Sequence, residues 1–382
     1  MFSPDFIGLL TEAVGEDKAL RVREALAGEP SVSIRLNPAK LEETPFPDAE
    51  PVPWSPYGWR LSGRPSFTLD PLFHAGCYYV QDSSAMAVGE VFRRCMDRLP
   101  EDPVVLDLCA APGGKTTDLA ASLREACGDR FLVVANEVVR SRFRILRDNV
   151  AAWGDPRVGV VCRDPSAFPD RPVFDAVVAD VPCSGEGMFR KDPKAVQDWS
   201  LQTVDFCAAR QRRILAAVWP SLKEGGLLVY STCTFNRREN DENVVWTASE
   251  LGADILDPGE IPGIGRTEYG YILLPGFVPG EGQYVAVLRK TTPADRPYRG
   301  DLPKDLGAEF PAQPFDEHLP WYDLDRKTAL QYLHGDALRL PEAPKGLLVL
   351  TCGGHPLGLA KNLGSRCNNL YPRERRIRME IR

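Results

Sequence analysis

The sequence has few of the features that mark secreted, metal-binding or membrane proteins. Its ten cysteines are scattered along 382 residues and none form a CxxC pair, so neither a disulfide framework nor a thiolate zinc site is suggested. Only four histidines are present, also dispersed, and we expect no metal. Residues 1–30 show no basic segment followed by an apolar run, and no stretch approaches the roughly 18 apolar residues of a membrane span. These absences predict a cytoplasmic protein with reduced thiols and no membrane contact.

Positive charge is also scarce overall, because the formal net charge is −7. Bulk charge therefore gives no attraction for nucleic acid. Arginines nevertheless gather in a predicted helix and in the C-terminal tail: Arg140, Arg142, Arg144 and Arg147, and Arg366, Arg373, Arg375, Arg376, Arg378 and Arg382. Each cluster is as compatible with a solvated basic surface as with contacts to phosphate. Charge alone leaves the substrate open.

The middle of the chain, 101–290, alternates apolar strands with helices. Strands are predicted at 103–109, 131–136, 158–162, 173–180 and 227–233, with two late strands near 271–277 and 284–290, and helices from about 115, over 140–153 and over 201–215. Near-continuous apolar strands separated by helices predict an α/β fold, a mostly parallel sheet with helices on both faces. In such sheets ligands bind beyond the carboxyl ends of the strands.

Three further segments flank this core. Residues 1–100 begin with two short helices and continue through a Pro- and Gly-rich segment, 38–76, predicted as loop and short strand. The aromatic residues there could anchor the loop to the core or stack on bases: Trp54, Tyr57, Trp59 and Phe67. Residues 291–317 are rich in Pro and charge and are predicted to be a linker. Residues 318–382 are predicted as a small module with a strand at 346–352, a GGHPLG turn and the basic tail.

The first strand ends in DLCAAPGGKT, a glycine turn before a helix. A nucleotide P-loop would need glycine where Cys109 stands, and the GxGxxG dinucleotide fingerprint is absent. A ligand that carries a nucleoside without pyrophosphate fits better, because Gly113 and Gly114 let the backbone approach closely and the helix N-terminus favours a carboxylate. S-adenosylmethionine has these groups.

Acidic residues follow the next two strands. Glu137 closes the second, about 20 residues after the glycine turn, where a carboxylate can bind two ribose hydroxyls. Asp164 follows the third and could accept a hydrogen bond from an adenine amino group. Either residue could instead cap a helix.

Cysteines follow the fourth and fifth strands. The fourth ends in ADVPCSGEG and the fifth in YSTCTF, which puts Cys183 and Cys233 at the edge of the sheet where the ligand is expected. A buried cysteine is usually inert packing, so the pattern alone leaves packing and chemistry open.

Four long segments in order, LDLCAAPGGKT, ANEVVRSR, VVADVPCSGEGMFRKDP and YSTCTFNRRENDENV, resemble the RNA cytosine-5 methyltransferases of the NOL/NOP/Sun family. The similarity covers about 100–290, with weaker similarity in SIRLNP and HAGCYYVQDSSAM. GMFRK and the terminal GGHPLGLAKN and NNLYP are most similar to the bacterial 16S rRNA (cytosine-C5)-methyltransferases of the F type. Those proteins carry a PUA-like RNA-binding module at the C-terminus. The resemblance implies a Rossmann-like methyltransferase core over 101–290, an N-terminal RNA-binding region over 1–100 and an α+β PUA-like module over 318–382.

The resemblance also implies a reaction, the transfer of a methyl group from S-adenosylmethionine to carbon 5 of cytosine in RNA. Cys233 would be the attacking thiolate and Cys183 would assist release of the adduct. Asp180 would hydrogen-bond the cytosine ring nitrogen, and Lys115 would supply positive charge that favours a thiolate. DNA cytosine-5 methyltransferases attack from the Pro-Cys position, so the residues alone admit either cysteine and only the resemblance selects Cys233. The implied cofactor contacts are Cys109, Ala110, Ala111, Pro112, Gly113, Gly114, Lys115, Glu137, Asp164 and Asp180.

The implied substrate is 16S rRNA, with the small ribosomal subunit as a partner, and nothing in the sequence demands more than a monomer. A tRNA substrate is the alternative within the same chemistry. A non-catalytic RNA-binding assembly factor is the alternative from another class, and the presence of both cysteines, Asp180 and Lys115 argues against it. Methyltransferases that act on small molecules or proteins need no cysteine pair.

Overall fold

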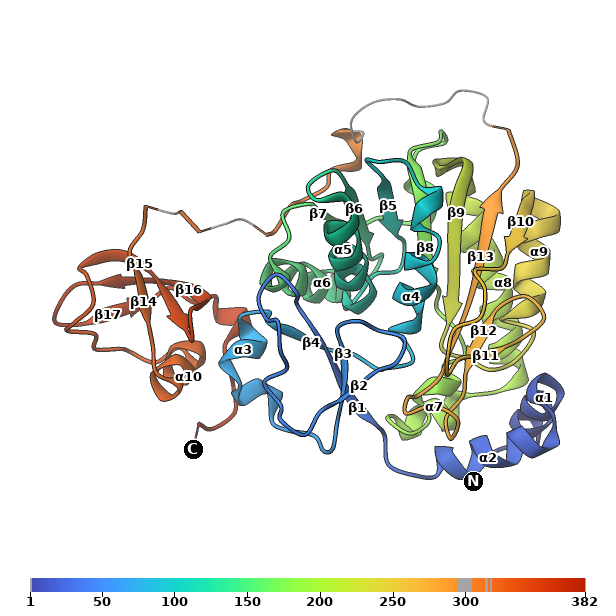
Figure 1. Ribbon diagram of the computed structural model, residues 1–382, viewed down its shortest axis with the longest axis horizontal. Coiled ribbons are helices and arrows are strands. Elements are labelled where there is room, and N and C mark those ends of the chain that lie inside the picture. The colour runs from blue at the N-terminus through green and yellow to red at the C-terminus, as the bar shows by residue number, and fades with distance from the viewer. Residues whose placement is uncertain (1, 294–303, 313–314, 317, 382) are drawn as a thin grey trace.

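Three β-sheets organise the chain (Figure 1). The structure is a computed structural model that describes residues 2–293, 304–312, 315–316 and 318–381. The expected linker over 291–317 therefore lies partly outside the described residues, as does Arg382 of the basic tail. No helix among the described residues has both the length and the apolar character needed to cross a membrane.

The central sheet contains nine strands. Five are parallel, in the order β7-β6-β5-β8-β9, and β13 continues the sheet antiparallel to β9. The bounds of the strands are β5 Val104–Asp107, β6 Leu132–Asn136, β7 Val158–Val161, β8 Phe174–Asp180, β9 Leu222–Thr232, β10 Ala253–Leu256, β11 Gly265–Arg266, β12 Tyr271–Leu273 and β13 Gln283–Lys290. The predicted parallel strands are all present.

Helices cover both faces of this sheet (Figure 1). Successive strand residues point to opposite faces, so Val105 packs with α4, α5 and α6, whereas Leu106 packs with α8 and α9. Both side chains are fully buried, and each such burial stabilises the fold by about 1.5–3 kcal/mol. These helices are α4 Ala87–Arg93, α5 Gly114–Cys127, α6 Arg140–Trp153, α8 Leu201–Val218 and α9 Asp241–Leu251. The short helix α7 Pro193–Asp198 packs instead in a separate core with Phe6 and Phe189.

The order of the strands decides where a ligand can bind. The chain runs outward from β5 through β6 to β7, then returns to the other side of β5 with β8 and β9. Loops after β5 and β8 therefore diverge to opposite faces, which leaves a crevice at the carboxyl ends of these two strands. The candidate residues predicted from the sequence follow the carboxyl ends of these strands, so they lie at the same edge of the sheet as the crevice.

The N-terminal region has its own four-stranded sheet, of order β2-β3-β1-β4. Its elements are α1 Pro4–Val14, α2 Glu16–Leu26, β1 Val32–Leu36, β2 Glu50–Pro51, β3 Gly58–Leu61, α3 Pro71–His74 and β4 Tyr78–Val80. The prediction of only loop and strand over 38–76 was wrong at α3, where Asp70 accepts a hydrogen bond from Leu72 N and Pro71 occupies the first turn. Trp54 and Phe67 are buried, as expected of aromatic residues that anchor a loop.

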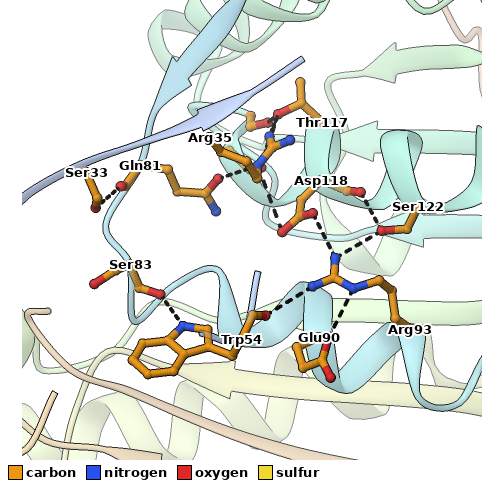
Figure 2. Close-up of polar contacts among 12 residues, drawn as sticks. Ser33, Arg35, Trp54, Gln81, Ser83, Glu90, Arg93, Thr117, Asp118 and Ser122 are labelled. Atoms are coloured by element: carbon orange, nitrogen blue, oxygen red, sulfur yellow. Dashed lines mark hydrogen bonds and ion pairs between the residues drawn. The ribbon is translucent and has the colours of Figure 1, made fainter. Parts of the chain in front are cut away.

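A buried arginine joins this sheet to the core (Figure 2). Arg35 of β1 donates to Gln81 Oε1 at 2.8 Å, to Thr117 Oγ1 and, at 3.1 Å, to the carbonyl of Gly114 in the first turn of α5. Asp118 on the same helix pairs with Arg93 of α4 at 3.2 Å and lies 3.9 Å from Arg35. The N-terminal region thereby fixes the start of the helix that follows the glycine turn.

The C-terminal module is α+β, with a four-stranded sheet of order β14-β15-β16-β17. Its elements are β14 Trp321–Asp323, α10 Arg326–His334, β15 Gly346–Cys352, β16 His355–Asn362 and β17 Cys367–Asn369. The predicted GGHPLG turn is shorter than expected, because β16 already begins at His355. Only the two glycines form the turn, and both have positive φ. Leu330 and Leu348 of this module share one hydrophobic core with Ile34 and Tyr78, so it packs on the N-terminal sheet (Figure 1).

Candidate active site

The two cysteines at the strand ends are in contact. Asp180, the last residue of β8, is in register with Ser231 of β9, so the loops that leave these strands run side by side. The Sγ atoms of Cys183 and Cys233 lie 3.2 Å apart, and both residues are half-buried. A hydrogen bond to Cys233, together with burial, holds the pKa of the Cys183 thiol well above its ordinary value. Cys183 therefore keeps its proton in this contact.

A charged pair lies beside the cysteines. Lys115 Nζ is 2.8 Å from Asp180 Oδ2. Burial by itself would lower the pKa of Lys115, but the Asp180 carboxylate outweighs it and the pKa stays above its ordinary value. Asp180 Oδ1 accepts hydrogen bonds from Ser231 Oγ at 2.7 Å and from Gln283 Nε2 at 3.1 Å. The carboxylate is thus held in a fixed orientation.

The loop after β5 is a tight turn held from α6. Gly113 has φ +112°, and an added Cβ would lie 3.2 Å from Leu146 Cδ1, so no other residue fits there without strain. Asn149 donates to the carbonyl of Pro112 at 2.7 Å, and Arg142 donates to the carbonyl of Ala111 at 2.7 Å. The backbone of this loop is consequently a rigid surface for a ligand.

A cavity of about 370 Å³ opens between this loop and α8. It is lined by the segments that follow β5, β6, β7 and β8 and by the helices α6 and α8, among them Cys109, Glu137, Asp164, Pro182, Arg210 and Arg213. Glu137 is buried and accepts a hydrogen bond from Val139 N at 2.8 Å. Asp164 is exposed and accepts from Ser166 N at 3.0 Å, so it caps a 3-10 helix and also lines the cavity. The capping interpretation of Asp164 is confirmed, and its contact with an adenine amino group stays a prediction.

The residues present fit S-adenosylmethionine. Leu108 and Cys109, at the start of the loop after β5, line the cavity, and Glu137 offers a carboxylate to a sugar. Asp107 is completely buried, and burial raises its pKa to about 7. In the part of the chain that the structure describes, its Oδ1 has no hydrogen-bond partner, which a donor group of a bound ligand could supply.

The predicted residues separate into two neighbouring groups. Cys109, Glu137 and Asp164 line the cavity, whereas Lys115, Asp180, Cys183 and Cys233 form a polar cluster that Pro182 connects to it. Ala110 and Ala111 are buried in the core beneath the loop. Sequence reasoning missed Arg210 and Arg213 of α8, and also Ser231 and Gln283. The signal available for the last two was a polar residue directly beside an apolar run, Ser231 after LLVY and Gln283 before YVAVL.

This strand order, with a glycine turn after the central strand and an acidic residue after the next, is that of a fold that binds nucleoside-containing cofactors. With the family comparisons that follow, it identifies a methyltransferase that uses S-adenosylmethionine. Profiles of known families agree: "16S rRNA methyltransferase RsmB/F" matches 96–288, "N-terminal domain of 16S rRNA methyltransferase RsmF" matches 2–83 and "Methyltransferase RsmF PUA domain" matches 321–377. The chain belongs to the RsmB/F family of 16S rRNA methyltransferases and is of the RsmF type. The predicted family, fold class and cofactor are confirmed.

Individual relatives cover almost the whole chain. The ribosomal RNA small subunit methyltransferase F of Enterobacter sp. (strain 638) is 30% identical over 98% of this chain and 96% of its own. The protein of the same name from Escherichia coli O139:H28 is 34% identical over 90% of this chain and 89% of its own.

Solved structures share the fold. The NSun6 protein of Pyrococcus horikoshii, determined with the S-adenosylmethionine analogue SFG, is 20% identical and superposes with a TM-score of 0.64 over 76% of this chain and 99% of its own. A methyltransferase homolog protein from the same organism is 25% identical, with a TM-score of 0.62 over 75% of this chain and 99% of its own.

Proposed function

We propose that this chain methylates carbon 5 of cytosine in 16S rRNA, with Cys233 as the nucleophile. The observation that carries the proposal is the pair of thiols in contact beside Lys115 and Asp180, next to the cofactor cavity. Carbon 5 of cytosine is a poor nucleophile until a thiolate adds to carbon 6 and turns the ring into an enamine. A base must afterwards remove the proton at carbon 5 so that the thiolate can leave. S-adenosylmethionine, when bound, supplies the electrophilic methyl group.

The surroundings of the two sulfurs support Cys233 as the thiolate. The charge of Cys233 is among the interactions that raise the pKa of Lys115, which makes this lysine a cationic neighbour of that sulfur. Cys183 has the buried Glu239 carboxylate as a neighbour, and it retains its proton. When the adduct breaks down, a water molecule takes the carbon-5 proton, the C5–C6 double bond re-forms and the bond between Cys233 Sγ and carbon 6 breaks. The Cys183 thiol assists by donating its hydrogen bond to the departing Cys233 sulfur. The two thiols thus have separate tasks, addition by Cys233 and release by Cys183.

Asp180 is suited to orient the target base. Ser231 and Gln283 hold Oδ1, and Oδ2, which accepts from Lys115, can also accept a hydrogen bond from the cytosine amino group or from the ring nitrogen when it carries a proton. Lys115 then remains near the reacting groups as positive charge. In the bound cofactor, Glu137 would bind the ribose and Asp164 would bind the adenine amino group. The backbone of 109–114 would contact the rest of the cofactor molecule.

The substrate is inferred from the family and from the PUA match, since the relatives are named for ribosomal RNA of the small subunit. Exposed arginines on α6 and in the tail, Arg140, Arg144, Arg373 and Arg378, supply contacts for phosphate. A target base must leave its stack to reach Cys233, which requires such contacts to the flanking RNA. We expect the protein to act as a monomer in the cytoplasm, on RNA or on the small subunit.

Transfer of labelled methyl groups tests the proposal. The purified protein is incubated with labelled S-adenosylmethionine and, separately, with 16S rRNA, assembled small subunits, tRNA, DNA and protein. Label in 16S rRNA or subunits, recovered as 5-methylcytidine and located by bisulfite sequencing, is the expected result. Label in tRNA alone would show that tRNA is the substrate. Label in a nucleoside other than 5-methylcytidine, or in protein, would overturn the proposed reaction.

A further inference from the structure

Two buried carboxylates lie behind the cysteines. Glu186 and Glu239 are 1% and 0% exposed, and neutral hydrogen-bond donors surround both. Burying charge in this way costs free energy unless it is well satisfied. Burial raises the pKa of Glu239 to about 7. None of the steps assigned above uses either residue.

Glu239 fixes the backbone directly after Cys183. Its Oε2 accepts hydrogen bonds from Ser184 N at 3.0 Å and from Gln211 Nε2 at 2.8 Å, and Gln211 also donates to the carbonyl of Pro182 at 3.1 Å. Its Oε1 accepts from Ser184 Oγ. The residues on both sides of Cys183 are therefore tied, directly or through one side chain, to this carboxylate.

The same carboxylate is tied to the loop that carries Cys233. Glu239 Oε1 accepts from Asn236 Nδ2 at 2.9 Å, and that amide also donates to Thr234 Oγ1 at 2.8 Å and to Glu186 Oε1 at 2.9 Å. Glu186 Oε2 in turn accepts from Phe235 N at 2.6 Å. Each residue from 234 to 236 is thus linked to the buried pair, Phe235 through its backbone and the other two through their side chains.

Backbone contact completes the arrangement. Gly187 N donates to the carbonyl of Cys233 at 2.7 Å, and a Cβ on Gly187 would lie 2.8 Å from that oxygen. The backbones of the loops after β8 and β9 are consequently in direct contact. Only glycine allows this approach.

We propose that Glu239 is a positioning residue which, through Ser184 and Asn236, holds the Cys183 and Cys233 loops together so that both sulfurs serve one target base. This inference rests on the proposed function. Addition and release act on the same adduct, so the two sulfurs must stay in register during both steps. A misplacement of about 1 Å at such a centre can cost about 10²-fold in rate.

Glu239 also distinguishes the two thiols by charge. The pKa of Cys183 is raised by its hydrogen bond to Cys233, then by burial, then by the negative charges of Cys233 and Glu239. Cys233 contacts this thiol, and Lys115, paired with Asp180, is the cationic neighbour of Cys233. The carboxylate therefore opposes a thiolate at Cys183 and leaves that role to the partner near Lys115.

Three variants test the proposal. Glu239→Ala removes the links to both loops, and Glu239→Gln keeps the size of the side chain but presents an amide group to donors. Asp175→Ala is the matched control, because Asp175 is also a buried carboxylate that accepts from a backbone amide, Val104 N, at 2.9 Å and pairs with Lys223 at 2.8 Å. It lies near the first residue of β8, at the end opposite to Asp180.

The first readout is geometric and needs no methyltransferase activity. Diamide oxidises the two thiols to a disulfide and is itself reduced to the hydrazine, and peptide mapping of the full chain quantifies the Cys183–Cys233 link. We expect wild type and Asp175→Ala to form this disulfide at the same rate and Glu239→Ala to form it severalfold more slowly. An unchanged rate in Glu239→Ala would overturn the proposal even if the assigned reaction proved wrong.

The second readout is kinetic. For Glu239→Ala we expect kcat on RNA to fall by about 10²-fold, with little change in the Kd for S-adenosylmethionine, since Glu239 does not line the cofactor cavity. Asp175→Ala should lose thermal stability but keep kcat. An equal loss of kcat in both variants at equal Tm would show a merely structural role. If Glu239→Ala does not fold, Glu239→Gln is the deciding variant. We expect it to form the disulfide more slowly than wild type and to have a lower kcat. Wild-type values of both quantities would contradict the proposal.

Discussion

The Sγ atoms of Cys183 and Cys233 lie 3.2 Å apart although 50 residues separate them in the chain. The contact exists because β8 and β9 are neighbours in register and both end at the same edge of the sheet. A protonated thiol next to a second sulfur, with an ammonium group nearby, is an arrangement in which one sulfur attacks and the other handles a proton.

Loss of Cys183 should trap the RNA. If Cys183 is needed only for release, Cys183→Ala still forms the covalent adduct but breaks it down slowly, so a protein–RNA complex stable in denaturing gels accumulates with S-adenosylmethionine present. Cys127→Ala, at the half-buried end of α5, is the control and should behave as wild type. Absence of a stable complex in Cys183→Ala would remove Cys183 from the release step.

Substitution of Gly113 should weaken cofactor binding. Its φ of +112° and its contact with Leu146 make Gly113→Ala strained, at a cost of about 1–2 kcal/mol per residue in that region of φ. We expect calorimetry to show a Kd for S-adenosylmethionine raised about tenfold. Gly128→Ala is matched in strain, with φ +63° at the far end of α5, and should leave this Kd unchanged. Equal effects on Kd would refute a specific role for the turn.

Asp107 should make the stability of the ligand-free protein fall as pH rises. Burial raises its pKa from 3.8 to about 7, so between these values the folded state binds more protons at this residue than the unfolded state does. The contribution of Asp107 to the free energy of unfolding therefore decreases from about pH 4 to about pH 7 and is constant above. Urea denaturation should show Asp107→Asn gaining stability relative to wild type across this window. A difference that does not depend on pH would contradict the raised pKa.

Arg35 should be a large contributor to the attachment of the N-terminal sheet. Arg35→Met leaves Gln81 Oε1 without its donor, removes one hydrogen bond to the carbonyl of Gly114 and removes a buried cation near Asp118 (Figure 2). We expect a loss of about 3–5 kcal/mol in the free energy of unfolding. Arg60→Met, which breaks an exposed pair with Glu50, should cost less than about 1 kcal/mol. Comparable losses in the two variants would show that the buried network adds little.

The central sheet could be predicted from the sequence because its strands are buried on both faces. That burial demands continuous apolar runs, and α6 was bounded correctly at Arg140–Trp153 by its periodicity and by Gly154. The positions of the cofactor loop and of both cysteines at one edge of the sheet could also be predicted, because the carboxyl ends of parallel strands share one edge.

Residues that reach the site by packing could not be predicted. Arg210 and Arg213 depend on which face α8 turns to the cavity, and Gln283 comes from an antiparallel strand whose neighbour no local pattern specifies. Glu239 and Arg35 are charged, so periodicity assigns them to the surface, whereas the structure buries both. Buried polar networks of this kind are set by tertiary contacts rather than by local sequence.

The most direct test of the account is to identify the residue that bonds to the base. RNA carrying 5-fluorocytosine at the target forms an adduct that cannot lose a proton from carbon 5, and after proteolysis mass spectrometry locates the attached peptide. The account predicts attachment to Cys233 in wild type and no adduct in Cys233→Ala. Attachment to Cys183, or an adduct that persists in Cys233→Ala, would contradict it.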